Sequence, residues 1–244
     1  MMKNTKIFLP VAFLILMLQY GCGIIDYAFL KPPEDTAREL AEAGSESMQS
    51  KNYGKAIDYY TKLKERYPFS PYTTSAELQL ADAYFLDGQY KAAEASYKEF
   101  ESVHPRHEAI PYVLFQIGKA NYNQFKSIDR PLEDVDEALQ YFRRLEEGYP
   151  DTDYAEKARE YIKASRKRMA EHELYVARYY WGQNDWGPAW KRYEYVAENF
   201  SDLPEVREYA RERADQAYLK FRVSSSKKER ESAEGTWKSW FRWL

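Results

Sequence analysis

The segment KNYGKAIDYYTKLKERYP, residues 51–68, carries the pattern on which the fold prediction is built. Ala56, Tyr60 and Leu63 are spaced by four and then three residues, so they share one face of a helix with 3.6 residues per turn. Pro68 ends this helix, because a proline ring clashes with the preceding turn and has no N–H to donate. The segment therefore predicts one amphipathic helix whose apolar face needs a partner.

The same offsets recur three more times along the chain. The other copies are Ala93, Tyr97, Phe100 and Pro105; Ala138, Phe142, Leu145 and Pro150; and Ala189, Tyr193 and Val196, with Ser201 in place of the proline. A small residue followed four positions later by a ring lets a second helix approach at the alanine while the ring fills the space beside it. Each copy is therefore predicted to be the second helix of a pair.

Segments with helical spacing lie where the partner helices are needed, directly before the second, third and fourth copies. They contain Ala83-Tyr84, Ile117-Gly118 and Val176-Ala177. This arrangement resembles the tetratricopeptide repeat, which has Leu-Gly-x-x-Tyr on one helix and Ala-x-x-x-Phe with a proline on the next. The resemblance implies an all-α superhelix of about five helix pairs, which we place at residues 34–222.

Caps, helix breakers and apolar spacing predict the remaining elements. We expect a first helix from a Thr36 cap to about Ser50, a loop at 124–133, one long helix or two nearly collinear ones from Thr152 to Trp181, and a last helix from Pro204 to Phe221. Three serines at 224–226 then predict a flexible exit, so that residues 223–244 form a tail.

This tail contains a short amphipathic segment. Its apolar residues follow the spacing i, i+3, i+4 and i+7 of one helical face: Trp237, Trp240, Phe241 and Leu244. Two docking sites remain open for the segment, a protein surface of this chain or of a partner, and a membrane interface.

The N-terminus predicts export and lipidation. Residues 1–21 have an early positive charge and a short apolar run, which is typical of a signal peptide. Gly21-Cys22 follows and resembles the bacterial lipobox, although Gln19 and Tyr20 depart from its preferred residues. We expect lipidation of Cys22, with residues 22–33 as a tether. Gly23, and not an aspartate, follows the cysteine, and the resemblance to sorted bacterial lipoproteins then implies the outer membrane. The alternative is an ordinary signal peptide that leaves a free thiol.

Composition and motifs argue for a protein that works by binding. The formal net charge is −3 and no basic stripe is present, so nucleic acid is not an expected partner. The three histidines, His104, His107 and His172, lack the usual spacing of metal ligands. No phosphate-binding glycine loop or nucleophile motif occurs either. We therefore predict no metal, no cofactor and no enzymatic activity.

A narrower resemblance rests on the string RYPFSPY at residues 66–72. The other matching positions are Ala83-Tyr84, His104-Pro105, Tyr112-Val113, Gly118, the string GYPDTDY at 148–154, and Tyr179-Tyr180. Together they look like the BamD family, the lipoproteins of the machine that inserts β-barrel proteins into the outer membrane. The likeness covers about Glu34 to Phe221.

This resemblance implies three kinds of partner: segments of unfolded outer-membrane proteins, the barrel-forming insertase subunit (BamA-like), and accessory lipoproteins. The candidates for the client-peptide groove are Tyr67, Phe69, Tyr72 and Tyr84. Alternatively, these rings only fill the joint between the first two repeats. Trp186 and Arg192 are the candidates for the partner interface, since Trp and Arg are favoured interface anchors; a packing Trp and a solvated Arg are the alternative.

Two other functions remain open on the residues alone. One is a different repeat-bearing envelope adaptor, such as a pilus-assembly lipoprotein or a Tol-associated protein. The other is a cell-wall or lipid enzyme on a helical scaffold.

Overall fold

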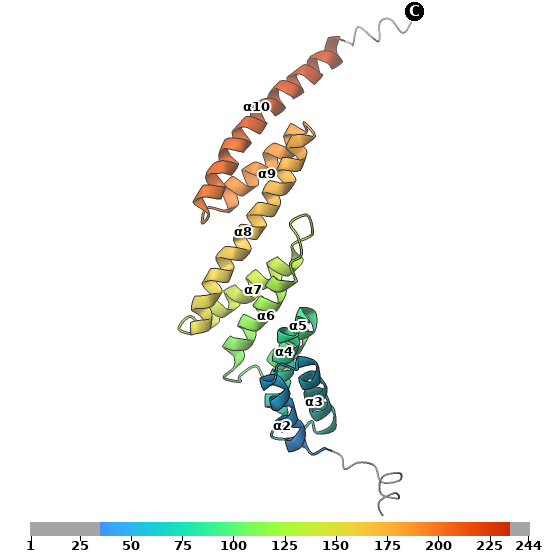
Figure 1. The fold of residues 1–244 in the computed structure, drawn as a ribbon. Helices are drawn as coiled ribbons and strands as arrows, with labels where there is room; N and C mark the ends of the chain where they lie inside the picture. Colours follow the sequence, from blue (N-terminus) through green and yellow to red (C-terminus); the bar gives the residue numbers. More distant parts are fainter. Residues whose placement is uncertain (1–34, 235–244) are drawn as a thin grey trace, which may run out of the picture. The chain divides into compact units, whose positions relative to one another are not determined.

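The computed structural model describes residues 35–234, and this part of the chain is helical without any strand (Figure 1). The helices are α2 (Ala37–Gln49), α3 (Tyr53–Arg66), α4 (Thr73–Leu86), α5 (Tyr90–Val103), α6 (Ile110–Gln124), α7 (Glu133–Gly148), α8 (Asp153–Gly182), α9 (Trp186–Asn199) and α10 (Pro204–Glu234). The all-α prediction is therefore confirmed. Cys22 and the tail residues Trp237, Trp240, Phe241 and Leu244 lie outside the described residues.

The helices belong to two compact units that divide within α4, between Ala76 and Glu77. The first unit holds α2, α3 and the beginning of α4. In the second unit, each helix from α5 to α9 contacts the next one along the chain. Contact between sequence neighbours is the pattern of a helical repeat array. The last repeat is represented by α10 alone, so the described part has four pairs and one single helix.

The four marker alanines hold the positions that their spacing predicts. Ala56, Ala93, Ala138 and Ala189 lie on α3, α5, α7 and α9, and each is 0% exposed. The ring four residues later is buried as well in every copy: Tyr60, Tyr97, Phe142 and Tyr193. Helix α3 packs on α2, α7 on α6 and α9 on α8. The Tyr97 hydroxyl of α5 bonds to Asp82 of α4, so the prediction that each copy is the second helix of a pair is confirmed for all four.

Two glycines show how closely the paired helices approach. A Cβ atom on Gly44 of α2 would lie 2.4 Å from Cε1 of Tyr60, and one on Gly118 of α6 would lie 2.6 Å from Cε1 of Phe142. Real Cβ atoms do not come this close to a ring. Each ring therefore lies directly on the backbone of the partner helix, at a place where only glycine fits.

All four second helices end in the same way. Their C-cap residues, Tyr67, His104, Tyr149 and Phe200, have φ between −140° and −118° and ψ between 52° and 55°. In each case the cap N–H donates to the carbonyl four residues earlier. The fourth copy reaches this geometry with Ser201 in place of the proline. Proline is thus compatible with the cap but is not needed to form it.

The structure also confirms the predicted cap of the first helix, the predicted loop before α7 and the predicted long helix. Thr36 caps α2 in a capping box, in which its side chain accepts from the Glu39 N–H and the Glu39 carboxylate accepts from the Thr36 N–H. The interval between α6 and α7 is a loop, and α8 is one continuous helix of 30 residues.

The predicted end of the last helix near Phe221 is wrong. Helix α10 continues through the three serines to Glu234. The hydroxyls of Ser224 and Ser226 donate back to the carbonyls of Phe221 and Val223, so these serines satisfy their polar groups within the helix. The expected flexible exit is therefore helical up to residue 234.

Candidate binding surfaces

The corner between α3 and α4 in the first unit carries three of the predicted client-facing rings. The Tyr67 hydroxyl donates to the backbone carbonyl of Asp35 at 2.8 Å, which ties the corner to the start of α2. Thr73 donates its hydroxyl to the Tyr67 carbonyl at 2.6 Å, which fixes the other end. Both sides of the corner are thus anchored by hydrogen bonds.

The rings in this corner differ in exposure. Phe69 is 99% exposed and Tyr72 is 41% exposed, whereas Tyr67 is partly buried. A fully exposed phenylalanine on an anchored turn is unusual for a residue that only packs, and it is available to a partner. Tyr84 behaves differently, because it belongs to the second unit and packs partly buried against that unit's core.

The predicted partner-interface residues lie on α9. Trp186 is partly buried: its ring meets Trp181 edge-on at 5.1 Å between centroids, and the Lys220 ammonium lies 4.5 Å from its ring centre. Arg192 donates to the Glu173 carboxylate of α8 at 2.7 Å, and its side chain is 47% exposed. Trp186 therefore packs between helices, while half of Arg192 remains accessible.

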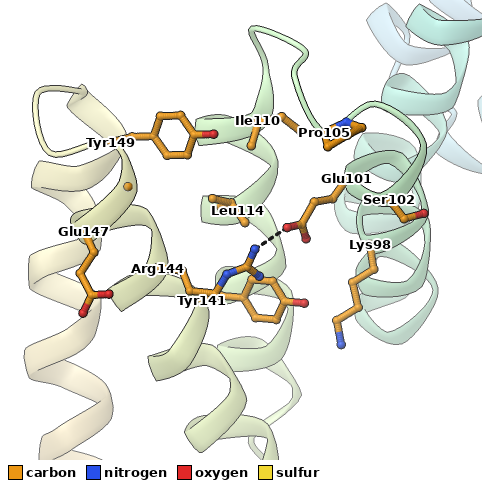
Figure 2. Close-up of a pocket in the computed structure, with 11 residues that line it drawn as sticks. Lys98, Glu101, Ser102, Pro105, Ile110, Leu114, Tyr141, Arg144, Glu147 and Tyr149 are labelled. Atoms are coloured by element: carbon orange, nitrogen blue, oxygen red, sulfur yellow. Dashed lines mark hydrogen bonds and ion pairs between the residues drawn. The ribbon is translucent and has the colours of Figure 1, made fainter.

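A groove of about 770 Å³ lies between α5 and α7 with α6 beneath it (Figure 2). Its lining residues are Lys98, Glu101, Ser102, Pro105, Ile110, Leu114, Tyr141, Arg144, Glu147, Gly148 and Tyr149. Ile110 and Leu114 of α6 form an apolar floor, and both are buried.

The two cations in this groove already have partners. Arg144 donates to Glu101 at 2.5 Å, across the groove in Figure 2. Lys98 bonds to Glu94 and Glu137. The Tyr141 ring lies between the two cations, 5.0 Å from the guanidinium carbon and 5.5 Å from the ammonium. An apolar floor framed by neutralised charges suits an apolar side chain better than a charged ligand.

A partly buried carboxylate, Asp82, joins α4, α5 and α6. It accepts hydrogen bonds from the hydroxyls of Tyr97 and Tyr112, both at 2.5 Å, and Gln116 donates to Tyr112 at 2.9 Å. Burial raises the pKa of Asp82 above its usual value, although the two hydroxyl bonds act in the opposite direction. Burial also raises the pKa of both tyrosines, so they remain hydrogen-bond donors. The network fixes one helix against the next.

Sequence reasoning missed this network, although it left a signal. The signal is the position of Asp82 between Ala81 and Ala83 in the sequence. Both alanines are 0% exposed, so the Asp82 carboxylate lies next to a packed helix face. Such a carboxylate needs nearby donors.

The three histidines take part in local contacts. His104 bonds to Glu77 at 2.8 Å, His107 accepts from the Ala109 N–H, and His172 bonds to the Ile128 carbonyl. Between residues 35 and 234, no three His, Cys, Asp or Glu side chains gather as metal ligands would. Within the same range, every helix is either too short or too polar for a membrane span.

A family model described as "Outer membrane lipoprotein", YfiO, matches residues 33–233, which include α2 to α9 and all of α10 except its last residue. The chain belongs to the YfiO family. This chain is also similar to curated proteins called outer membrane protein assembly factor BamD, so the resemblance seen in the RYPFSPY string is confirmed at the level of the family.

Relatives of this YfiO-family chain come from several bacteria. The BamD of Vibrio cholerae serotype O1 is 27% identical over 204 residues, which cover 80% of this chain and 83% of the relative. The BamD of Neisseria gonorrhoeae is 28% identical over 59% of this chain, and that of Xylella fastidiosa (strain Temecula1) is 28% identical over 64%. The alignments span 58% and 57% of these two relatives, respectively.

Among solved structures, the chain is similar to the one described as the TPR2AB-domain:pHSP90-complex of yeast Sti1. The identity is 17%, the alignment covers 76% of this chain and 70% of that one, and the TM-score is 0.47. The repeat assignment of this YfiO-family chain rests on its own helix pairs.

Proposed function

We propose that this chain is a non-enzymatic scaffold of the machine that assembles β-barrel proteins in the outer membrane. A lipid on Cys22 holds it on the periplasmic face of that membrane. It binds segments of unfolded outer-membrane proteins and the barrel-forming, BamA-like insertase subunit, together with accessory lipoproteins. The observation that carries the proposal is the family match over residues 33–233, because it includes every helix that presents a candidate surface.

The physical mechanism is tethering. Lipid attachment confines the scaffold to a surface, and a client held there meets the insertase at a raised effective concentration. Rigid helix pairs present side chains in fixed positions, so binding does not require the scaffold itself to become ordered. The anchored corner with its exposed Phe69 supports the client part of this proposal.

Photocrosslinking at Phe69 tests client binding. A photoreactive phenylalanine analogue at position 69 is expected to crosslink to unfolded outer-membrane proteins in growing cells, because this ring is exposed and its turn is fixed. The measurement is mass spectrometry of the crosslinked products. The matched control is the same analogue at Val103, an exposed apolar position at the end of α5. Equal client yields at both positions, or none at 69, would contradict the proposal.

A charge swap at Arg192 tests the contact with the insertase. Arg192→Glu is expected to lower co-purification of the insertase in mild detergent at least about tenfold, since an interfacial charge pair is replaced by repulsion. The double variant Arg192→Glu with Glu173→Arg restores the ion pair between α9 and α8. If Arg192 contacts the insertase, this double variant stays defective. Full recovery would show that the arginine acts only within the chain.

Absence of the insertase from pull-downs of the unmodified protein would remove the assignment to barrel assembly as a whole.

A further inference from the structure

The corner between α3 and α4 holds two apolar side chains open to solvent. In the described part of the first unit, Phe69 is 99% exposed and Tyr72 is 41% exposed. The turn that carries them is rigid: the Ser70 N–H donates to the Tyr67 carbonyl at 3.0 Å, and the Tyr72 N–H donates to the Ser70 hydroxyl at 3.3 Å. A ring presented in this way gains from any apolar cover, because its burial is favourable and the turn needs no further ordering.

The chain enters the first unit directly beside this corner. The Tyr67 hydroxyl bonds to the carbonyl of Asp35, which is the first described residue. Tyr72 lies close to Arg38, near the start of α2. The pKa of Arg38 is raised by its hydrogen bond to Glu42 and, to a smaller extent, by the nearby Tyr72 phenol. The segment that precedes Asp35 therefore starts next to both tyrosines of the corner.

This preceding segment is long enough to reach the exposed rings. Phe69 follows Tyr67 by two residues, so their Cα atoms are at most about 7 Å apart. Four residues, two of them prolines, separate Leu30 from Asp35. A proline-rich linker of that length spans about 12 Å. The side chain of Leu30, and that of Phe29 before it, can therefore reach the corner.

The composition of the tether is unlike that of a fully solvated linker, which is rich in polar and charged residues. Between residues 24 and 30 the tether carries five large apolar or aromatic side chains: Ile24, Ile25, Tyr27, Phe29 and Leu30. The two isoleucines closely follow the predicted lipid site at Cys22, so the bilayer surface can cover them. Phe29 and Leu30 are nearer to Asp35 along the chain, and the corner offers them an apolar surface.

We propose that Phe29 and Leu30 of the tether dock on Phe69 and Tyr72 of the same chain. The docking needs no client. Its regulatory effect rests on the function proposed above, because the tether then covers the surface assigned to the client and has to be displaced before the client binds.

The short linker makes this contact effective even if it is weak. A linker of four residues keeps the tether at the corner at an effective concentration on the order of millimolar. A contact with a dissociation constant of about 1 mM is then formed for much of the time, and it weakens client binding several-fold.

Photocrosslinking of the purified, lipidated chain tests the docking without any client. The protein is reconstituted in vesicles of phosphatidylethanolamine and phosphatidylglycerol, with a photoreactive phenylalanine analogue at position 69. We expect crosslinks to residues 27–30 of the same chain, located by peptide mass spectrometry. An equal mixture of unlabelled and ¹⁵N-labelled protein distinguishes contacts within one chain from contacts between two copies. The same analogue at Val103, an exposed residue at the end of α5, is the positional control.

Two double variants of the tether separate the docking residues from their neighbours. Phe29→Ser with Leu30→Ser is expected to lower the tether crosslinks from position 69 at least about fivefold, and to raise client crosslinking there in growing cells about threefold. The matched control, Ile24→Ser with Ile25→Ser, also removes two apolar side chains and is expected to change neither yield. All four positions precede every described helix, and circular dichroism checks that the helical content is unchanged.

The proposal is overturned if position 69 gives no more tether crosslinks than Val103, or if these crosslinks form only between two copies. It is also overturned if the isoleucine variant has the same effect as the Phe29 and Leu30 variant, or if an analogue at position 29 crosslinks to lipid and not to the corner. Tether crosslinks without client crosslinks in any variant would support the docking and refute client binding at Phe69, so the two proposals fail separately.

Discussion

Gly118→Ala is expected to lower the free energy of unfolding by about 2 kcal/mol. The new Cβ atom would lie within 2.8 Å of three ring atoms of Phe142, and that ring is 0% exposed, so it has no free space to enter. Overpacking of a filled core costs about 1–3 kcal/mol and occasionally more, and the better helix propensity of alanine returns only about 1 kcal/mol. Urea unfolding followed by circular dichroism measures the loss.

Gly54→Ala is the matched control for this prediction. Gly54 also lies in a helix, but a Cβ atom there meets nothing within 4 Å, so the variant is expected to be neutral or slightly stabilising. Gly118→Ala combined with Phe142→Leu should cost less than the sum of the two single changes, because the shorter side chain vacates part of the contested space. Additive costs would show that Gly118 and Phe142 do not compete for that space.

Cys22→Ser is expected to abolish acyl labelling and release the protein from the membrane. The chain has one cysteine, so any label on the parent protein is assigned without ambiguity. A single acyl chain binds a bilayer only marginally, whereas two or more hold a protein stably, so loss of the attachment point is expected to remove the anchor completely. Metabolic labelling with a palmitate analogue and membrane fractionation measure both effects.

One result would contradict the prediction that Cys22 carries the lipid anchor. Unchanged membrane residence, with no label on the parent protein, would show that Cys22 is a free thiol behind an ordinary signal peptide. Circular dichroism of the released variant serves as the control, since residue 22 precedes every described helix and its replacement should leave the helical content unchanged.

The helix pairs were predictable because the spacing of apolar residues along each helix shows which face packs against a partner. Ala138 and Phe142 lie on one face of one helix, so the four-residue offset alone shows which side meets a partner. The ends of the second helices were predictable for the same local reason. The close approach at Gly118 was only partly visible, because a glycine in a helical pattern does not reveal which ring will lie against it.

The end of α10 was mispredicted because serine has two opposing tendencies. A run such as Ser224-Ser225-Ser226 is typical of a linker, yet a serine hydroxyl that donates to a carbonyl one turn earlier fits inside a helix. The good helix formers that follow, Lys227 and Lys228 among them, decide the outcome.

The candidate surfaces were less predictable than the fold. The RYPFSPY string pointed to the corner, but only the structure distinguishes the exposed Phe69 from the hydrogen-bonded Tyr67. Tyr84 was grouped with them by its aromatic character, whereas it packs on the core of another unit. The Asp82 network joins residues from three helices, and contacts between distant segments leave no periodic trace in a single sequence.

The ring-on-glycine contacts also limit how this molecule can move. If α7 slid along α6 by one helical turn, the Phe142 ring would meet the side chain of Leu114 or Tyr122, four residues from Gly118 on the same face, instead of the bare backbone of Gly118. The axial register of that pair is therefore locked, and the contact of Tyr60 with Gly44 locks the pair of α2 and α3 in the same way. Any adjustment during binding has to come from side-chain rotation or from movement of whole pairs, and not from translation of one helix past its mate.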